Sequence, residues 1–195
     1  MDLRKRRSQE KLQVALAHHL QNKTIDEITI GELTRTAGVS RQTFYSNFDS
    51  KQSILLTRIE ALFAKSKAYF ESISTREDLG REEVVELGFI NIIEECNKER
   101  NMMRAAFTGQ AGIQCLSLLK RLLSKLIADR ILFQFNYNFD RDQLDTISDF
   151  YAGALIGTIQ GWLLDTEGNK DLQTVARQVG RLIPHGLDAY LHARE

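Results

Sequence analysis

Residues 28–51 read ITIGELTRTAGVSRQTFYSNFDSK, a pattern typical of two short helices joined by a tight turn. Thr29 and Glu32 have the spacing of a capping box, which predicts the start of the first helix at Thr29. Gly38 can adopt the left-handed conformation that a helix end requires. Ser40 is a suitable N-cap for the helix that follows. Two helices connected in this way form a helix-turn-helix.

The second of these helices, residues 41–48, has an apolar face and a polar face. Phe44 and Phe48 lie four residues apart and form the inner face. The rest of the helix carries Arg41, Gln42, Thr43, Tyr45, Ser46 and Asn47. Such side chains can read base edges and bind phosphates. Residues 41–48 contain no Asp or Glu, and the next acidic residue is Asp49. The pattern favours DNA binding, and the other interpretation is a plain helical hairpin within a bundle.

This segment resembles the DNA-binding domain of the TetR family of bacterial transcriptional regulators. The motifs that carry the resemblance are Ala37-Gly38-Val39-Ser40, Thr43-Phe44-Tyr45, Phe48 and Lys51. The resemblance covers about residues 8–56 and implies that the second helix enters the major groove. Arg41 and Gln42 are then expected to contact guanine and adenine. Many relatives have a small residue at the position of Gln42, so their operators do not transfer to this chain.

The resemblance also implies contacts to the DNA backbone. Ser40, Thr43 and Tyr45 are expected to contact phosphates. Lys51 begins the next helix, where its charge and the free backbone N–H groups both suit a phosphate. Thr29, at the start of the first helix of the motif, is expected to touch the backbone of the other strand.

The charge of the chain is zero overall but unevenly distributed. Residues 1–51 contain nine Lys/Arg and six Asp/Glu, a net charge of +3, whereas residues 52–195 carry a net charge of −3. The basic excess lies in Arg4-Lys5-Arg6-Arg7. This run is either an arm that enters an adjacent minor groove or a disordered, solvated arm. Local basic charge matters more for DNA binding than the overall charge does.

Composition and patterning predict an all-α protein. Of 195 residues, 43% are hydrophobic and only one is Pro, and no sustained alternation of apolar and polar residues predicts strands. We expect an N-terminal three-helix helix-turn-helix DNA-binding domain, residues 1–50, followed by a larger helical ligand-binding and dimerisation domain, residues 51–195. The expected helices cover about residues 8–20, 29–37, 41–48, 50–72, 82–97, 99–107, 113–133, 142–164 and 171–193.

The last two helices are the expected dimer interface. A protein that reads DNA with one short helix gains affinity and specificity by dimerising. Gly153, Gly157 and Gly161 form a stripe that allows another helix to approach closely. The residues expected to supply the hydrophobic driving force around the stripe are Leu155, Ile156, Ile159, Trp162 and Leu163. The resemblance implies that residues 142–193 pair across a two-fold axis; the other interpretation is that the stripe packs on the protein's own core.

A ligand cavity is implied around the helix expected at residues 82–97. This helix is apolar on most sides, which indicates burial. Asn91 shares a helical face with Val84 and Leu87 and is a candidate polar contact inside an apolar pocket. The other candidate lining residues are Phe89, Met102, Met103, Phe107, Phe133, Tyr151 and Trp162. Each of these candidates is also a common core residue in the absence of any ligand.

Little in the sequence points to catalysis or to a cofactor. Cys96 and Cys115 make neither a disulfide framework nor a zinc site and are expected to be buried. No nucleophile triad or phosphate loop is recognisable, so we expect no enzyme, no metal and no cofactor. The most apolar segment, residues 150–164, is shorter than the ~20 residues of a membrane span. With no secretory signal, the expected location is the cytoplasm.

The first functional hypothesis is a homodimeric repressor that a small apolar or amphipathic ligand releases from its operator DNA. The alternative is a family member that acts as an activator or adaptor through a protein partner, without a small-molecule ligand. A filled interior together with a large exposed apolar patch would favour that alternative. The sequence does not identify the ligand, the operator or the regulated genes.

Overall fold

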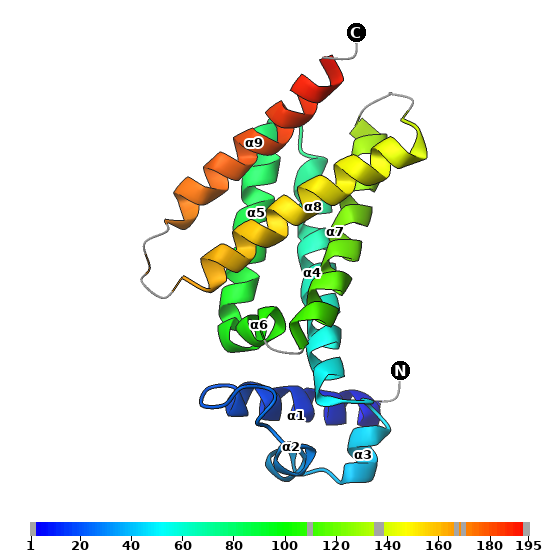
Figure 1. The fold of residues 1–195 in the computed structure, drawn as a ribbon, viewed down its shortest axis with the longest axis vertical. Helices are drawn as coiled ribbons and strands as arrows, with labels where there is room; N and C mark the ends of the chain where they lie inside the picture. The colour runs from blue at the N-terminus through cyan, green and yellow to red at the C-terminus, as the bar shows by residue number, and fades with distance from the viewer. Residues whose placement is uncertain (1–2, 109–110, 135–138, 166–167, 169–170, 193–195) are drawn as a thin grey trace. The chain divides into compact units, whose positions relative to one another are not determined.

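The computed structural model describes residues 3–108, 111–134, 139–165, 168 and 171–192, without the side chains of residues 133–134 and 191–192. Within these ranges every regular element is a helix, which confirms the predicted all-α class (Figure 1). The helices are α1 (Leu3–His19), α2 (Ile30–Ala37), α3 (Arg41–Tyr45), α4 (Lys51–Ser74), α5 (Arg81–Lys98), α6 (Arg100–Phe107), α7 (Ala111–Gln134), α8 (Arg141–Leu163) and α9 (Leu172–His192).

The helices divide into two compact units. The first unit comprises residues 1–61 and 99–119, and the second comprises residues 62–98 and 120–195. Helices α4 and α7 therefore each contribute residues to both units. The predicted boundary near residue 50 separates a DNA-binding domain from a ligand-binding domain. The division into compact units does not test these functions, so this boundary stays a prediction.

The first unit is built around the packing of α1, α2 and α3. Leu12 and Leu16 of α1, Leu33 of α2 and Phe44 of α3 have no exposed surface. Burying side chains of this size stabilises a fold by about 1.5–3 kcal/mol each. Helix α6 belongs to this unit, and its preceding residue Glu99 forms an ion pair with Arg58 of α4.

Two predicted helix boundaries in this unit are wrong. Helix α1 begins at Leu3 rather than Ser8, and the Ser8 hydroxyl donates to the carbonyl of Arg4 (3.0 Å) instead of capping the helix. Residues 4–7 contain no helix breaker, and Arg and Lys are good helix formers. Helix α3 ends at Tyr45 rather than Phe48, because the Asn47 amide donates to the carbonyl of Thr43 (2.7 Å) and competes with the backbone.

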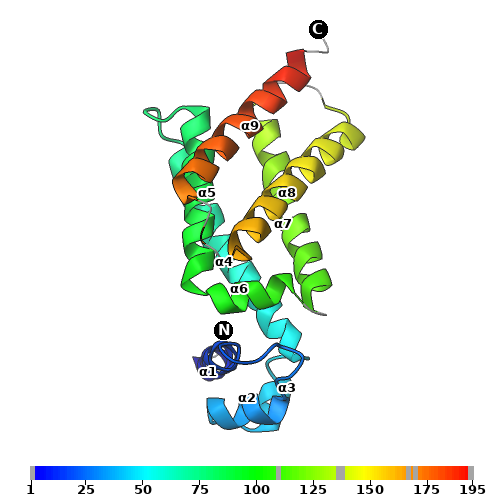
Figure 2. The same cartoon turned by 60° about the vertical axis from the view of Figure 1, so that its left-hand side comes forward.

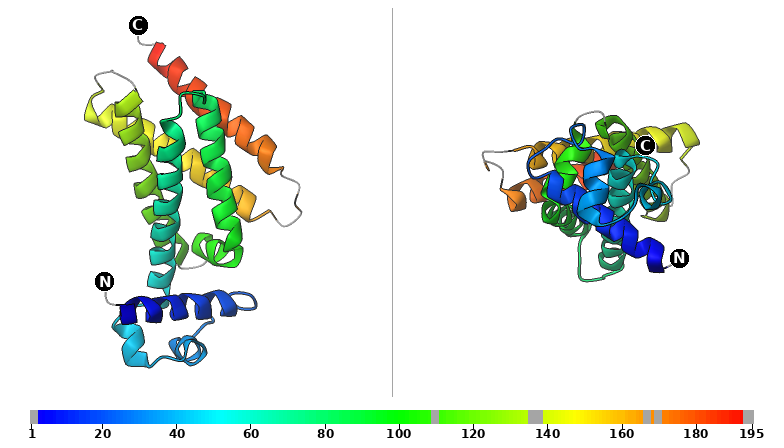
Figure 3. Two further views of the ribbon diagram at one scale, coloured as in Figure 1. Left: turned by 180° about the vertical axis from the view of Figure 1, so that it is seen from behind. Right: turned by 90° about the horizontal axis from the view of Figure 1, so that it is seen from below.

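The second unit has two layers. One layer contains α5 with the later parts of α4 and α7, and the other contains α8 and α9, which cross it (Figures 1 and 3). Helix α9 packs closely against α5 (Figure 2). A Cβ atom added at Gly180 of α9 would lie 2.9 Å from the carbonyl oxygen of Glu82 in α5. The missing side chain at Gly180 is therefore what allows the two backbones to approach this closely.

Candidate DNA-binding surface and ligand cavity

The start of α2 carries the predicted capping box. The Thr29 hydroxyl accepts from the backbone N–H of Glu32 (3.2 Å), and the Glu32 carboxylate accepts from the backbone N–H of Thr29 (2.8 Å). Lys23 pairs with the same carboxylate at 2.5 Å. The Lys23 ammonium and the N–H of Thr29 together lower the pKa of Glu32 to about 2. Thr29 thus lies exposed at a well-defined helix start, as the DNA-contact prediction requires.

The turn between α2 and α3 has the conformation that its sequence predicts. Gly38 has φ +63°, and its N–H donates to the carbonyl of Arg35 (3.2 Å). Ser40 caps α3 by accepting from the N–H of Thr43 (3.0 Å), and the two hydroxyls lie 2.9 Å apart. The hydroxyls of Ser40 and Thr43 therefore already support the fold of the turn, whether or not they also bind phosphate.

The solvent-facing side of α3 presents the two residues predicted to contact bases and one residue predicted to contact a phosphate. Arg41, Gln42 and Tyr45 are all exposed. The Arg41 guanidinium extends back toward α2. Its Nη2 lies 3.1 Å from the position that a Cβ atom at Gly31 would occupy. The structure therefore brings Arg41 next to the first turn of α2. This side of the first unit is a polar surface with one exposed cation at the start of α3.

Lys51 has a role that the sequence analysis did not predict. Its ammonium donates to the carbonyl of Asp26 (2.9 Å) and to the carbonyl of Ile28 (2.7 Å). These bonds attach the start of α4 to the segment between α1 and α2. An ammonium has three N–H donors, so one remains for a phosphate. No local sequence pattern indicates this contact, because it joins residues more than twenty positions apart.

The basic run Arg4–Arg7 is helical and exposed. The guanidinium of Arg6 pairs with Glu10 one turn later, at 3.0 Å. Surface pairs of this kind contribute only about 0.3–0.5 kcal/mol. The run thus adds positive charge to the surface of α1 and is helical rather than disordered, whereas its entry into a minor groove stays a prediction.

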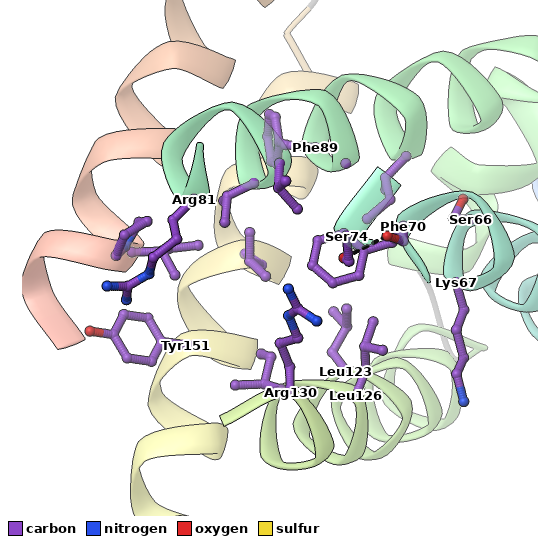
Figure 4. A pocket seen from close by; sticks show the side chains of 18 of the residues that line it. Ser66, Lys67, Phe70, Ser74, Arg81, Phe89, Leu123, Leu126, Arg130 and Tyr151 are labelled. Carbon is purple, nitrogen blue, oxygen red and sulfur yellow. Dashed lines mark hydrogen bonds between the residues drawn. The ribbon is translucent and has the colours of Figure 1, made fainter. Parts of the chain in front are cut away.

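The second unit contains a cavity of about 280 Å³. Its lining comes from α4, α5, α7, α8 and α9 and is mostly apolar (Figure 4). Phe63 and Phe70 of α4 contribute aromatic surface. Gly88 of α5 leaves room for the Phe70 ring, because a Cβ atom at residue 88 would lie 2.7 Å from that ring. Of the predicted lining residues, Phe89 and Tyr151 line this cavity.

The other predicted lining residues do not line it. Met103 and Phe107 belong to α6 in the first unit, where Met103 is a buried core residue, as is Met102. Asn91 lies at the margin of the α5 stripe that faces the cavity, and its buried Oδ1 has no hydrogen-bond partner. Trp162 lies near the end of α8, beyond the lining residues. The side chain of Phe133 lies outside the described residues.

The sequence analysis missed the polar part of the lining. Ser66, Lys67 and Ser74 of α4, Arg81 of α5 and Arg130 of α7 all line the cavity. Charged residues at these positions look like ordinary surface residues in a helical pattern. Only the packing of α7 against the other helices indicates that Arg130 is directed inward.

The described residues offer no metal site. No group of three or more His, Cys, Asp or Glu side chains lies close enough together to hold an ion. Cys96 and Cys115 are buried free thiols, as predicted. Burial raises the pKa of Cys96 to about 12 and that of Cys115 to about 11. Among the helices described here, none is long and apolar enough to cross a membrane.

The chain combines a helix-turn-helix, the arrangement of DNA-binding regulators, with a helical unit that contains a cavity. Residues 83–185 match the TetR-type family described as "Transcriptional regulator C-terminal region". The chain therefore belongs to the TetR family of transcriptional regulators. Its relatives are regulators of transcription, so the prediction that it is not an enzyme is confirmed.

Among curated proteins, the chain is similar to the HTH-type transcriptional regulator EthR of Mycobacterium tuberculosis, with 25% identity over 111 residues. That match covers 56% of this chain and 51% of EthR, so the chain spans about half the length of these relatives. It is also 22% identical to the uncharacterised HTH-type regulator YdgC of Bacillus subtilis over 185 residues, which are 92% of each chain.

Solved structures share the fold. The FadR repressor of Thermus thermophilus, in complex with lauroyl-CoA, has a TM-score of 0.65 at 20% identity, covering 91% of this chain and 94% of its own. The dihydroxyacetone kinase operon activator DhaS has a TM-score of 0.63 at 17% identity, covering 93% and 97%. At such identities the likeness establishes the fold and leaves the ligand open.

Proposed function

We propose that this regulator is a homodimeric repressor that binds a near-palindromic operator through α3 and leaves it when a small apolar or amphipathic ligand occupies the cavity. The observation that carries the proposal is the double role of α4. Its first part belongs to the helix-turn-helix unit, where Ile54 and Leu55 are fully buried. Its later part contributes Phe63 and Phe70 to the cavity.

This arrangement provides a physical route from ligand to DNA. A ligand that shifts the later part of α4 at the cavity also shifts the first part of the same helix, which belongs to the helix-turn-helix unit. In a dimer, two α3 helices must enter major grooves about 34 Å apart on one face of the duplex. A small change in their separation therefore weakens the contacts in both half-sites, which couples ligand binding to DNA release.

An open surface on α8 and α9 supports dimerisation. Gly153 and Gly157 are exposed, and a Cβ atom added at either would meet no atom within 4 Å. Phe150 of the same stripe is 69% exposed, and Leu182 of α9 is 71% exposed. The glycines at 153 and 157 thus do not pack on the protein's own core, which was the alternative interpretation.

The hydrophobic residues expected to drive dimerisation need one correction. Ile156, Ile159 and Leu163 are buried within the chain's own second unit. They face inward because they lie on the side of α8 opposite the exposed glycines. Phe150, Ala154 and Leu182 remain as the exposed apolar residues for a dimer contact about the glycine stripe.

The alternative, an activator or adaptor that acts through a protein partner, predicts a filled interior. A cavity of about 280 Å³ among apolar side chains does not match that expectation. Ligand pockets in proteins measure about 300–1,000 Å³, so this volume lies just below that range. The cavity therefore favours a small-molecule effector.

The decisive test is selection of binding sites from random duplex DNA at near-physiological salt, with the mass of the protein in solution measured in parallel. We expect a palindromic site bound by a dimer. Binding without sequence preference, or a monomer bound to a single half-site, would contradict the proposal. The selected operator then serves as the probe in a screen for compounds that release the protein.

A further inference from the structure

The polar groups of the cavity are strongly biased toward positive charge. Three cationic side chains line it: Lys67, Arg81 and Arg130. Among the described residues that line the cavity, none is an Asp or a Glu. The rest of the wall is mostly apolar, and charge effects are stronger next to apolar walls than in water. The cavity is therefore an apolar space with a basic lining.

Two of these cations are held at the margin of the cavity. The Arg81 guanidinium donates to both oxygens of Asp188 (2.9 and 3.0 Å) and extends toward Tyr151 (Figure 4). The Lys67 side chain is 39% exposed and pairs with Glu71 at 3.6 Å. The two carboxylates, Asp188 and Glu71, do not line the cavity.

Arg130 occupies a different position. Its side chain rises from α7 into the middle of the lining residues, between Phe70 and Leu123 (Figure 4). The guanidinium carbon lies 5.9 Å from the centroid of the Phe70 ring, within the range of a cation–π contact. Burial and the like charge of Arg81 lower the pKa of Arg130, so these surroundings disfavour its positive charge. An anion in the cavity would offset that cost.

We infer that the effector is an organic acid with an apolar body, and that Arg130 binds its carboxylate. A guanidinium matches a carboxylate with two parallel hydrogen bonds, which fixes orientation as well as affinity. The apolar wall accommodates the body of the acid. The inference rests on the proposed function, since it specifies the ligand of the same cavity.

The size and the second polar group of the cavity narrow the ligand class. At roughly 30 Å³ for each water-sized atom, a volume of about 280 Å³ accommodates about nine non-hydrogen atoms. Octanoate, with ten, is a suitable probe. The buried Ser66 hydroxyl lines the same cavity and has no hydrogen-bond partner among the described residues. An acid with a further polar atom that reaches Ser66 should therefore bind more tightly than a plain alkyl acid.

The test compares octanoate with octan-1-ol, an uncharged ligand with the same chain, by calorimetry on the full-length protein. We expect octanoate to bind at least ten times more tightly than octan-1-ol. Arg130→Met keeps an unbranched apolar stem and removes the guanidinium, and should weaken octanoate at least tenfold while changing octan-1-ol less than threefold. Arg130→Lys should retain part of the preference for the acid. Arg121→Met, at an exposed arginine of α7 that does not line the cavity, is the matched control and should retain all of it.

The inference is overturned if no acid from hexanoate to dodecanoate binds more tightly than its alcohol, or if Arg130→Met weakens both ligands equally. These outcomes are separate from a failure of the proposed function, because calorimetry needs no DNA. If octanoate binds through Arg130 but does not release the operator, the ligand class stands and the release mechanism fails. If only an uncharged compound releases the operator, the repressor function stands and the organic acid is wrong.

Discussion

Arg41 in the first unit and Arg130 in the second are the same residue type in opposite surroundings. Arg41 is exposed at the start of α3, next to the first turn of α2. Arg130 lines a cavity with mostly apolar walls and lies over an aromatic ring. An exposed guanidinium suits a large, strongly charged partner such as DNA. A partly buried guanidinium suits a small anion that can enter the cavity with it.

The two units also differ in how their functional groups are assembled. The predicted DNA contacts come from one continuous segment, residues 29–51. The cavity takes its lining from five helices between residues 63 and 187. A surface made by one segment tolerates change elsewhere in the chain, whereas a cavity made by five helices depends on all of their packing. The following experiments test whether the units differ in this way.

The largest effect is expected for Phe44→Ala in the first unit. Phe44 has no exposed surface, and replacing a buried Phe by Ala costs about 3–5 kcal/mol of stability. Its neighbour Tyr45 is 57% exposed, so Tyr45→Ala should cost about 0.5 kcal/mol or less. Urea unfolding followed by circular dichroism measures both. Equal effects would mean that α3 does not pack through Phe44, and loss of octanoate binding in Phe44→Ala would mean that the units are not independent.

Arg41→Ala and Gln42→Ala should each cost about 1–3 kcal/mol in binding the selected operator and relax the preference at one base pair. Both side chains are exposed, so the stability of the fold should change little. Binding to the operator and to its single-base variants measures the effect. Arg121→Ala, at an exposed arginine of α7 in the second unit, is the control. Unchanged discrimination in either variant removes that residue from the base contacts.

The two glycine environments in the second unit predict opposite outcomes. Gly180→Ala places a Cβ atom 2.9 Å from a backbone oxygen of α5 and should destabilise the unit by about 1–3 kcal/mol. Gly157→Ala meets no atom of the same chain, so it should leave the fold intact and weaken the dimer. Unfolding experiments and sedimentation measure the two effects. A Gly157→Ala protein with unchanged dimer affinity would move the interface away from the glycine stripe.

Lys51→Met should lower the stability of the first unit by about 1–2 kcal/mol, because it leaves the carbonyls of Asp26 and Ile28 without their charged donor. It should also weaken binding to all DNA sequences alike, since a phosphate contact carries no base information. The control is Lys125→Met, at an exposed lysine of α7. Weaker DNA binding at unchanged stability would make Lys51 a phosphate contact alone, and a selective effect on one operator would contradict the phosphate contact.

The smallest effect is expected at the two thiols, one in each unit. With pKa values of about 11 for Cys115 and about 12 for Cys96, at most about one thousandth of either thiol is ionised at pH 8. Since the thiolate is the reactive form, iodoacetamide should label neither cysteine in the native protein and both in urea. Mass spectrometry identifies the labelled site. Rapid native labelling of one cysteine would identify the unit that opens more readily.

The helix-turn-helix could be predicted in detail because its determinants are local. The Thr29 and Glu32 capping box, the left-handed Gly38 and the buried Phe44 are each specified by residues at most four positions apart. The two wrong boundaries, at Ser8 and Phe48, are also local: each depends on one side chain that bonds to the backbone in a way the pattern does not distinguish. Lys51 is different, because its carbonyl partners lie at residues 26 and 28.

The sequence by itself determined the all-α class, the family and the position of the helix-turn-helix that contains the proposed DNA-reading helix. The tertiary structure alone decided which residues line the cavity. Of the residues predicted for a ligand pocket, Phe89 and Tyr151 line this cavity, but Arg130 could not be predicted, since a charged residue in an amphipathic helix is normally solvated. Whether a side chain faces water or a cavity depends on helices that pack against it from elsewhere in the chain. Helix periodicity predicts which face of a single helix is apolar, whereas the cavity forms only where five helices pack together.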